Sequence, residues 1–348
     1  MPALDHILRL RHAAIFVALA ALLVVVPAAV AAATPTQLSA KVTPAVVTYP
    51  GQAVVAGTII GIPGAELTLE TRPAGGAGVW SPAGAATASS SGAFRFELAP
   101  SVSSDLRVSY AGALPQHDAA SVELHLVVSA RVTISSPKEP WLGHIVRLSG
   151  AVAPAHPGAP VTIQRREDGV WQSLATTTLG DDARFLVRWQ PTEAGRYRLR
   201  ARMEADADHG VSASPTMLVI VNQPNPHHVL YKYAHYIVIV RHEFRLYYYE
   251  HGTLVRGFNV ALGRPGYRTP LGHFRIYGKR KPAGGALGAC AMYYRARGAI
   301  AIHGTDEPWL IRRRPPRDFS HGCARMLNRQ VLWLYARVPV GTRVHNLP

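Results

Sequence analysis

Two short segments near the C-terminus combine the residue types needed for acyl transfer by a thiol. The segment "AIAIHGTDEPW" ends an apolar run at His303, and "FSHGCARM" contains Cys323, one of only two cysteines in 348 residues. Such chemistry needs a thiol nucleophile, a base for its proton and N–H donors for the oxyanion. Cys323 can supply the thiol, His303 the base, and Gly322 a tight turn that presents backbone N–H groups. We expect the neighbouring His and Arg groups to lower the pKa of the thiol.

Two other roles for the cysteine stay open at this point. His303, His321 and Cys323 have the ligand types of a zinc site, although the His321-Gly-Cys323 spacing is tight and a fourth ligand is not evident. A disulfide between Cys290 and Cys323 would form only in an oxidising compartment. Cys290, within "GALGACAMYY", also suits a buried small residue.

The spacing of these motifs resembles that of a known family. His303-Gly304 followed by "SHGCARMLN" is similar to the signature of the L,D-transpeptidase (YkuD-type) catalytic domain. The upstream segments "YRTPLGHFRI" and "FRLYYYEHGTLVRGFNVALG" also resemble elements of that family, so the resemblance extends from about Val238 to Val344. It implies a β-sandwich-like catalytic domain that acts on peptidoglycan stem peptides. A cysteine would release D-Ala from a tetrapeptide stem, and a second stem would resolve the thioester as a 3→3 cross-link.

The resemblance also implies roles for individual residues. Cys323 would be the nucleophile and His303 the general base and then acid, with His321 a second candidate for proton transfer. The Gly304 carbonyl would hold the imidazole tautomer, and the Gly322 and Cys323 amides would form the oxyanion hole. No cofactor or metal is expected.

Further residues of the same region are candidates for contact with the substrate. Arg325 matches a basic position of the motif and would bind a stem carboxylate or brace the loop. Ser320 more plausibly caps the turn than attacks a carbonyl, and Asn328 braces the same turn. Tyr293 and Tyr294 are candidates to border the substrate groove, although core packing is favoured for at least one of them.

The elements that must position these residues are mainly strands. Ile237–Val240 and Phe244–Tyr249 are predicted as strands, with a hairpin turn at Glu250–Gly252 after the second. Apolar residues spaced three and four apart predict a single helix over Arg329–Val338, packed against the sheet.

The residues before this region form a duplicated β pattern. "SGAFRFEL" from Ser91 resembles "DDARFLVRW" from Asp181, and Trp80 and Trp171 have the same offset as Phe94 and Phe185. A period near 90 residues suits two tandem sandwiches that resemble immunoglobulin-like modules. We therefore expect a mainly β chain with Ig-like modules at 36–130 and 131–222, a linker at 223–229 and the catalytic domain at 230–348.

The N-terminal 33 residues resemble an export signal. A basic start with Arg9 and Arg11 precedes an uncharged apolar run and an Ala-rich end. This segment is predicted to be a signal peptide or an N-terminal membrane anchor. Either form would place the remainder of the chain outside the cytoplasm, at the cell wall.

Basic residues are concentrated in the last third of the chain. The formal net charge is +16, and residues 228–348 contain 20 Lys and Arg against 5 Asp and Glu. A field of one sign attracts the opposite charge, so anionic cell-wall material is a candidate partner, with Arg312–Arg314 at the groove rim. Nucleic acid is not expected, because the chain is predicted to be exported and lacks a nucleic-acid-binding motif.

The sequence leaves the outcome of the thioester open. Water in place of an amine would make the protein an L,D-carboxypeptidase, and a silent site would make it a non-catalytic cell-wall-binding protein.

Overall fold

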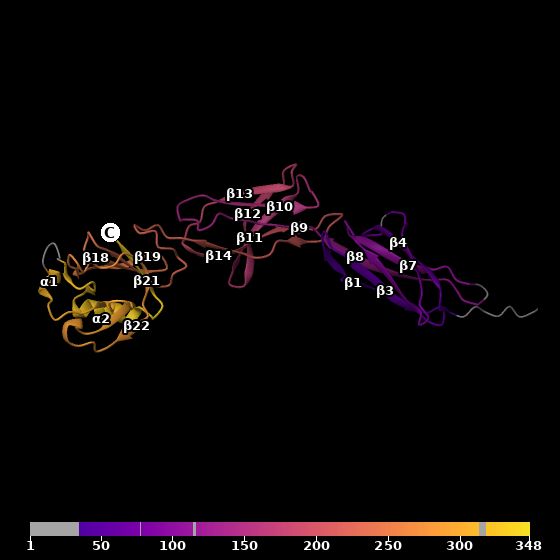
Figure 1. Ribbon diagram of the computed structural model, residues 1–348. Coiled ribbons are helices and arrows are strands. Elements are labelled where there is room, and N and C mark those ends of the chain that lie inside the picture. The colour runs from indigo at the N-terminus through magenta and orange to yellow at the C-terminus, as the bar shows by residue number, and fades with distance from the viewer. Residues whose placement is uncertain (1–34, 77, 114–115, 313–317) are drawn as a thin grey trace, which may run out of the picture.

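The chain folds into three β-rich bodies that follow one another in sequence order (Figure 1). The computed structural model describes residues 35–76, 78–113, 116–312 and 318–348. The predicted export segment and residues Arg313 and Arg314 of the basic run therefore lie outside the described residues. Within them, no helix is long and apolar enough to cross a membrane.

Module 1 is a sandwich of two sheets, with strand orders β1-β3-β6 and β2-β8-β7-β4-β5. Its strands are β1 (Leu38–Thr43), β2 (Val46–Thr48), β3 (Ala53–Ile59), β4 (Glu66–Pro73), β5 (Ser81–Thr87), β6 (Ala93–Leu98), β7 (Ser104–Tyr110) and β8 (Ala120–Ser129). Side chains alternate between buried and exposed along most of them, because successive residues of a strand face opposite sides. The buried faces of both sheets meet in one core that includes Val55, Leu67 and Leu106.

Module 2 repeats this architecture, with sheets β13-β10-β9 and β12-β11-β14-β15, where β16 also pairs with β14. Its strands are β9 (Arg131–Val132), β10 (Val146–Ala153), β11 (Pro160–Glu167), β12 (Val170–Thr178), β13 (Arg184–Trp189), β14 (Gly195–Met203), β15 (Ser212–Ala213) and β16 (Met217–Val221). Its own core includes Leu148, Ile163 and Leu199. The immunoglobulin-like assignment of both modules stays a prediction.

Equivalent residues occupy equivalent places in the two modules. Gly57 on β3 pairs with Phe94 on β6, and Gly150 on β10 pairs with Phe185 on β13. In each pair the phenylalanine ring lies over the glycine, where a Cβ atom would collide with it and with a carbonyl oxygen of the neighbouring strand. The duplication read from the sequence therefore extends to the packing of the core.

The two repeated tryptophans lie outside the main cores. The guanidinium groups of Arg72 and Arg107 lie 4.2 and 4.5 Å from the centroid of the Trp80 ring. Arg200 covers the Trp171 ring at 4.2 Å. Cation–π contacts of this kind stabilise a half-exposed ring.

The third body contains a five-stranded sheet, β19-β18-β17-β27-β21, a four-stranded sheet, β22-β23-β24-β26, and the short pair β20-β25. Its strands are β17 (Tyr236–Val240), β18 (Arg245–Glu250), β19 (Thr253–Asn259), β20 (Leu262–Gly263), β21 (Gly272–Arg275), β22 (Gly278–Arg280), β23 (Ala291–Arg295), β24 (Ile300–His303), β25 (Asp318–Ser320), β26 (Ala324–Arg325) and β27 (Arg343–Leu347). Its helical elements are η1 (Gly285–Leu287), α1 (Trp309–Arg312) and α2 (Asn328–Arg337).

The core of this body joins both large sheets to α2. Ile237 from β17, Ile302 from β24 and Leu334 from α2 belong to one buried cluster. The predicted strands at Ile237–Val240 and Phe244–Tyr249 and the predicted helix at Arg329–Val338 are confirmed within one or two residues. The mainly β fold with a short C-terminal helix is therefore confirmed, although the four-residue α1 was not predicted.

The packing at Gly150 makes a testable difference to stability. Alanine normally stabilises a strand relative to glycine by about 0.5–1 kcal/mol. At Gly150 the new methyl group would meet the Thr133 carbonyl oxygen and the Phe185 ring, and such overpacking costs about 1–3 kcal/mol. We therefore expect Gly150→Ala to lower the melting temperature of module 2 in calorimetry of the full chain.

Gly278 on β22 is the matched control, because a Cβ atom there meets nothing within 4 Å. Gly278→Ala should leave the transition of module 2 in place and slightly stabilise the third body. Equal melting profiles for Gly150→Ala and the unaltered chain would contradict the packing argument.

Candidate active site

His303 is the last residue of β24, which lies in the middle of its four-stranded sheet. Its side chain is 3% exposed. Its backbone carbonyl accepts a hydrogen bond from Met326 N at 2.8 Å, which ties it to the segment that follows Cys323. The position of the imidazole is therefore set by pairing of the backbone on both sides.

Cys323 lies in the turn that joins β25 to β26. Ser320 is 1% exposed, and its hydroxyl closes this turn by donating to the Cys323 carbonyl at 2.6 Å and accepting from Gly322 N at 3.1 Å. Gly322 has φ +115°, and a Cβ atom there would lie 2.7 Å from Ile300 Cδ1. Glycine is therefore required at that position. Ser320 braces the turn as expected, and its contact with substrate stays a prediction.

Parallel pairing of β24 with β26 brings the histidine and the cysteine to one face. His303 pairs with Arg325 and Ile302 with Ala324, so the register places Ala301 opposite Cys323. Ala301 N donates to Cys323 Sγ at 3.4 Å, in agreement with this register. Since residues two apart in a strand share a face, His303 and Cys323 are diagonal neighbours with Cα atoms roughly 8 Å apart.

The tautomer of His303 is fixed by the backbone. Nδ1 lies 2.5 Å from the Gly304 carbonyl oxygen, which can only accept, so Nδ1 carries the proton and Nε2 has a free lone pair. Burial lowers the pKa of His303 to about 4, and the nearby charge of Arg325 acts in the same direction. The imidazole is therefore neutral at pH 7 and able to accept a proton.

The pKa of Cys323 does not follow the expectation from the sequence. Burial raises the pKa of the thiol, and the Ala301 N–H and the charge of Arg325 oppose this rise without outweighing it. The predicted lowering of the thiol pKa is therefore wrong for the free protein. Cys323 is a thiol at neutral pH and needs a base to become a nucleophile.

Arg325 lies on the same face and connects the two loops of the site. Its Nη1 donates to Glu307 Oε2 at 2.7 Å, and Glu307 follows His303 in the loop before α1. Its buried Nε has no hydrogen-bond partner in the part of the chain that the structure describes. Arg325 thus braces the loop and keeps one donor unused.

Asn328, the first residue of α2, holds the backbone beside His303. Its Oδ1 accepts from Ala289 N at 3.0 Å and from Thr305 N at 3.2 Å, and its Nδ2 donates to the Thr305 carbonyl at 3.0 Å. A Cβ atom on Gly304 or Gly288 would collide with this amide. Asn328 therefore braces the loop after His303 and not, as expected, the turn that holds Cys323.

The expected pair of oxyanion donors needs a correction. Gly322 N already donates to Ser320 Oγ, so its N–H is not free. Cys323 N has no acceptor among the described residues. The free donor is therefore the amide of Cys323, and Gly322 contributes its backbone conformation.

His321 is exposed and lies among basic and aromatic groups. Arg264 Nη2 donates to His321 Nε2 at 2.7 Å, and the Tyr267 ring lies 4.8 Å from the imidazole. Nε2 of His321 therefore accepts a hydrogen bond from Arg264. The role of His321 in proton transfer stays a prediction. Arg264 and Tyr267 were missed from the sequence because they lie 57 and 54 residues before His321 in the chain.

Tyr294 does not border a groove. It is 3% exposed, packs 5.4 Å from the Phe274 ring and receives a hydrogen bond from Asn346 Nδ2 at 3.3 Å. The prediction of substrate contact for Tyr294 is wrong. Its half-buried neighbour Tyr293 packs instead with Ala301 and Cys323 on the face of the site.

The two alternative roles of Cys323 disagree with the geometry. Cys290 is fully buried in the main core beside Met292, whereas Cys323 packs on the opposite face of the sheet, and both thiols are free. His303, His321 and Cys323 do not converge. Among the described residues, the group of metal-ligating side chains that does converge is His156, Asp206 and His209 in module 2.

Comparison with known proteins identifies the family of the third body. A family model described as the L,D-transpeptidase catalytic domain, YkuD, matches residues 234–345. The protein provisionally named L,D-transpeptidase YkuD in Bacillus licheniformis is 34% identical over 131 residues, which cover 38% of this chain and 74% of that protein. Its namesake in Bacillus subtilis is 31% identical over 154 residues, covering 43% of this chain and 88% of that protein.

A solved L,D-transpeptidase from Mycobacterium smegmatis is similar over 63% of this chain and 99% of its own, with 15% identity and a TM-score of 0.30. A TM-score this low supports no conclusion by itself.

The hydrogen bonds of the Asn328 side chain predict that its substitution destabilises the third body. Asn328→Ala would strand the N–H group of Thr305, a residue that is 2% exposed, and a buried unsatisfied donor costs about 1–3 kcal/mol. We expect the free energy of unfolding of the third body to fall by about 2 kcal/mol in urea titration. Asn259→Ala, which removes only an acceptor of the Arg245 side chain, is the matched control and should cost less.

The raised pKa of Cys323 predicts how its alkylation depends on pH. Iodoacetamide reacts with the thiolate, so the rate should rise about tenfold per pH unit from pH 6 to 8, without a plateau. Peptide mass spectrometry would report the rate at Cys323. Cys290 is the internal control, because burial raises its pKa to about 11 and shields it. A plateau between pH 5 and 7 would instead reveal a preformed thiolate–imidazolium pair and contradict the assignment.

Proposed function

Because the chain belongs to the L,D-transpeptidase family with the YkuD catalytic domain, we propose that it transfers acyl groups between peptidoglycan stem peptides through Cys323. The observation that carries this proposal is the β24–β26 register, which sets a thiol and a neutral imidazole with a free Nε2 on one face. A shift of this register by one residue would place residues 303 and 323 on opposite faces.

The first half of the reaction forms a thioester. As Cys323 Sγ attacks the carbonyl carbon of the bond between the L-centre of the third residue and D-Ala, His303 Nε2 takes the thiol proton. The oxyanion of the tetrahedral intermediate accepts a hydrogen bond from Cys323 N. When the intermediate collapses, the imidazolium returns the proton to the D-Ala amine, which leaves. Both groups start neutral, so proton transfer accompanies the attack.

The second half resolves the thioester. An amine of a neighbouring stem gives its proton to His303 as it attacks the thioester, and Cys323 leaves as a thiol. The product is a 3→3 cross-link. The Arg325 guanidinium lies at this face, and its positive charge would favour a carboxylate of either stem.

The proposed place of action is outside the cytoplasm, at the cell wall. Peptidoglycan lies there, and the N-terminal segment has the composition of an export signal or anchor. The net positive charge of residues 228–348 would favour approach to anionic wall material.

The decisive experiment gives the full chain a disaccharide with a tetrapeptide stem and reads product masses. A cross-linked dimer with loss of D-Ala supports transpeptidation. Loss of D-Ala alone would make the protein an L,D-carboxypeptidase, and unchanged substrate would favour a non-catalytic wall-binding role.

Substitutions should separate the roles of the two residues. Cys323→Ala should abolish both the product and a thioester adduct detectable by intact mass. His303→Gln should slow adduct formation by about 10²- to 10⁴-fold, the usual contribution of general acid–base catalysis. His242→Gln serves as the control, because His242 is exposed and its ring contacts the Pro348 carbonyl and Glu243, away from the two residues tested. Full activity in Cys323→Ala would refute the nucleophile.

A further inference from the structure

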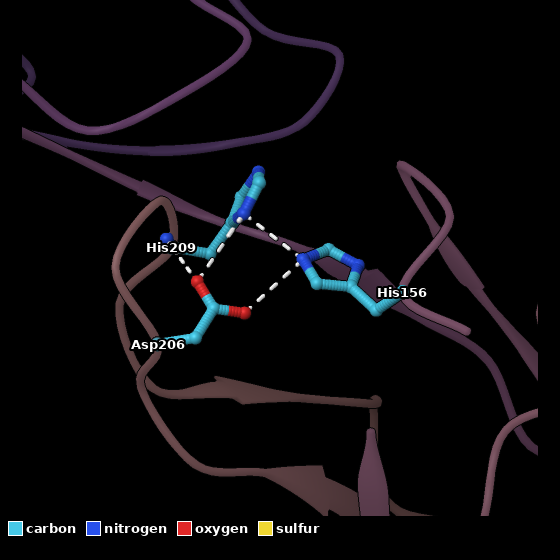
Figure 2. A group of neighbouring side chains, drawn as sticks. All are labelled: His156, Asp206 and His209. Carbon is cyan, nitrogen blue, oxygen red and sulfur yellow. Dashed lines mark hydrogen bonds and ion pairs between the residues drawn. The ribbon is translucent and has the colours of Figure 1, made fainter. Parts of the chain in front are cut away.

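A second cluster of reactive side chains lies in module 2, far along the chain from the site above. His156 is in the loop between β10 and β11, and Asp206 and His209 are in the loop between β14 and β15 (Figure 2). His156 Nε2 lies 3.0 Å from His209 Nδ1 and 3.3 Å from Asp206 Oδ2. His209 Nδ1 lies 3.7 Å from Asp206 Oδ1. The three side chains therefore point toward one another.

The outer nitrogen of each histidine is fixed as a donor. His156 Nδ1 lies 2.7 Å from the Pro154 carbonyl oxygen, and His209 Nε2 lies 2.9 Å from the Ser101 carbonyl oxygen. A carbonyl accepts only, so in each neutral ring the proton is on the outer nitrogen. The two inner nitrogens are then lone pairs that face each other and a carboxylate. Three acceptors in contact repel one another unless a cation lies between them.

The spacing suits a metal ion. Zinc binds histidine nitrogen and carboxylate oxygen at about 2.0–2.2 Å in tetrahedral geometry, which separates neighbouring ligand atoms by about 3.3–3.5 Å. The two nitrogens lie 3.0 Å apart and His156 Nε2 lies 3.3 Å from Asp206 Oδ2, close to this value, while the other carboxylate oxygen, Oδ1, lies 3.7 Å from His209 Nδ1. Hydrogen bonds from both ligand histidines to backbone carbonyls are the usual outer contacts of zinc sites. Asp206 is also held in place, because its Oδ1 accepts from Asp208 N and His209 N at 2.8 and 2.7 Å.

We propose that His156 Nε2, His209 Nδ1 and the Asp206 carboxylate bind one divalent transition-metal ion, zinc being the best match, with water in the remaining position. Two imidazoles and one carboxylate are a common donor set for this ion. Asp206 is exposed and His209 is buried, so the open position faces solvent on the Asp206 side. This site is separate from the thiol chemistry and does not depend on it.

The metal would also stiffen the junction between modules 1 and 2. The loop that holds Asp206 and His209 contacts module 1 through Asp208, whose carbonyl accepts from Ser103 N at 2.7 Å, and through Gly210, whose N–H donates to the Val128 carbonyl at 2.8 Å. His209 itself donates to Ser101 of module 1. A metal ion would join this loop to the β10–β11 loop of module 2, so the junction would lose mobility.

The test is zinc uptake by the full chain in a Cys323→Ala background, which removes the accessible thiol. After treatment with a chelator and dialysis, calorimetric titration with zinc should show one tight equivalent. Asp206→Asn keeps Oδ1 as an acceptor for the backbone but removes the charge, and His156→Gln removes one ligand. Each should weaken zinc binding by more than about 10-fold, since even outer-shell partners of zinc ligands contribute about 10- to 100-fold.

A matched control separates this site from general binding to histidine. His125 contacts Asp105 in module 1 without a second histidine, so His125→Gln should leave the tight equivalent unchanged. X-ray absorption of the zinc-loaded protein provides a readout without ligand substitutions, and it should give two imidazoles and one or two further oxygens. Absence of a tight equivalent, equal affinity in Asp206→Asn, or a spectrum without imidazole would overturn the proposal, with a proton shared between the histidines instead.

Discussion

The parallel pairing of β24 with β26 is the constraint on which the candidate active site depends. Its register places His303 opposite Arg325 and therefore sets Cys323 two residues back on the same face. A slip of one residue would turn Cys323 into the core, because side chains alternate between the two faces of a strand. The surrounding contacts serve this register: Met326 N bonds to the His303 carbonyl, the Ser320 hydroxyl closes the turn, and Asn328 holds the loop after His303.

Burial gives the site its chemical state. Withdrawal from water disfavours charge, so the same environment lowers the pKa of His303 and raises that of Cys323. The proton stays on the sulfur of the free protein, and the imidazole stays ready to receive it. Arg325 favours the thiolate and disfavours the imidazolium, so its charge alone does not produce an ion pair. In the proposed reaction a bound stem would exclude further water, and deprotonation of the thiol would accompany the attack.

Local patterns in the sequence predicted most of the elements but few of the contacts between them. The strands at β17 and β18 and the helix α2 follow from apolar periodicity, and His303 and Cys323 follow from motifs of fixed spacing. Tyr294 was misplaced although alternation from the buried Cys290 and Met292 already assigns it to the core face. The Gly322 N–H was misassigned because its acceptor, Ser320 Oγ, depends on the conformation of the turn. His156 and His209 were missed because 53 residues separate them and only the fold brings them together.

The histidines of the two sites follow one rule with different outcomes. In each case a backbone carbonyl accepts a hydrogen bond from the protonated ring nitrogen. The other ring nitrogen then points inward and carries a lone pair. At His303 the inward lone pair shares its face with a thiol, which has a proton to give, so the arrangement suits proton transfer. At His156 and His209 two inward lone pairs meet a carboxylate, and none of the three groups has a proton to give. The groups that face the lone pair, and not the histidine itself, therefore distinguish a site for acid–base chemistry from a site that binds a cation.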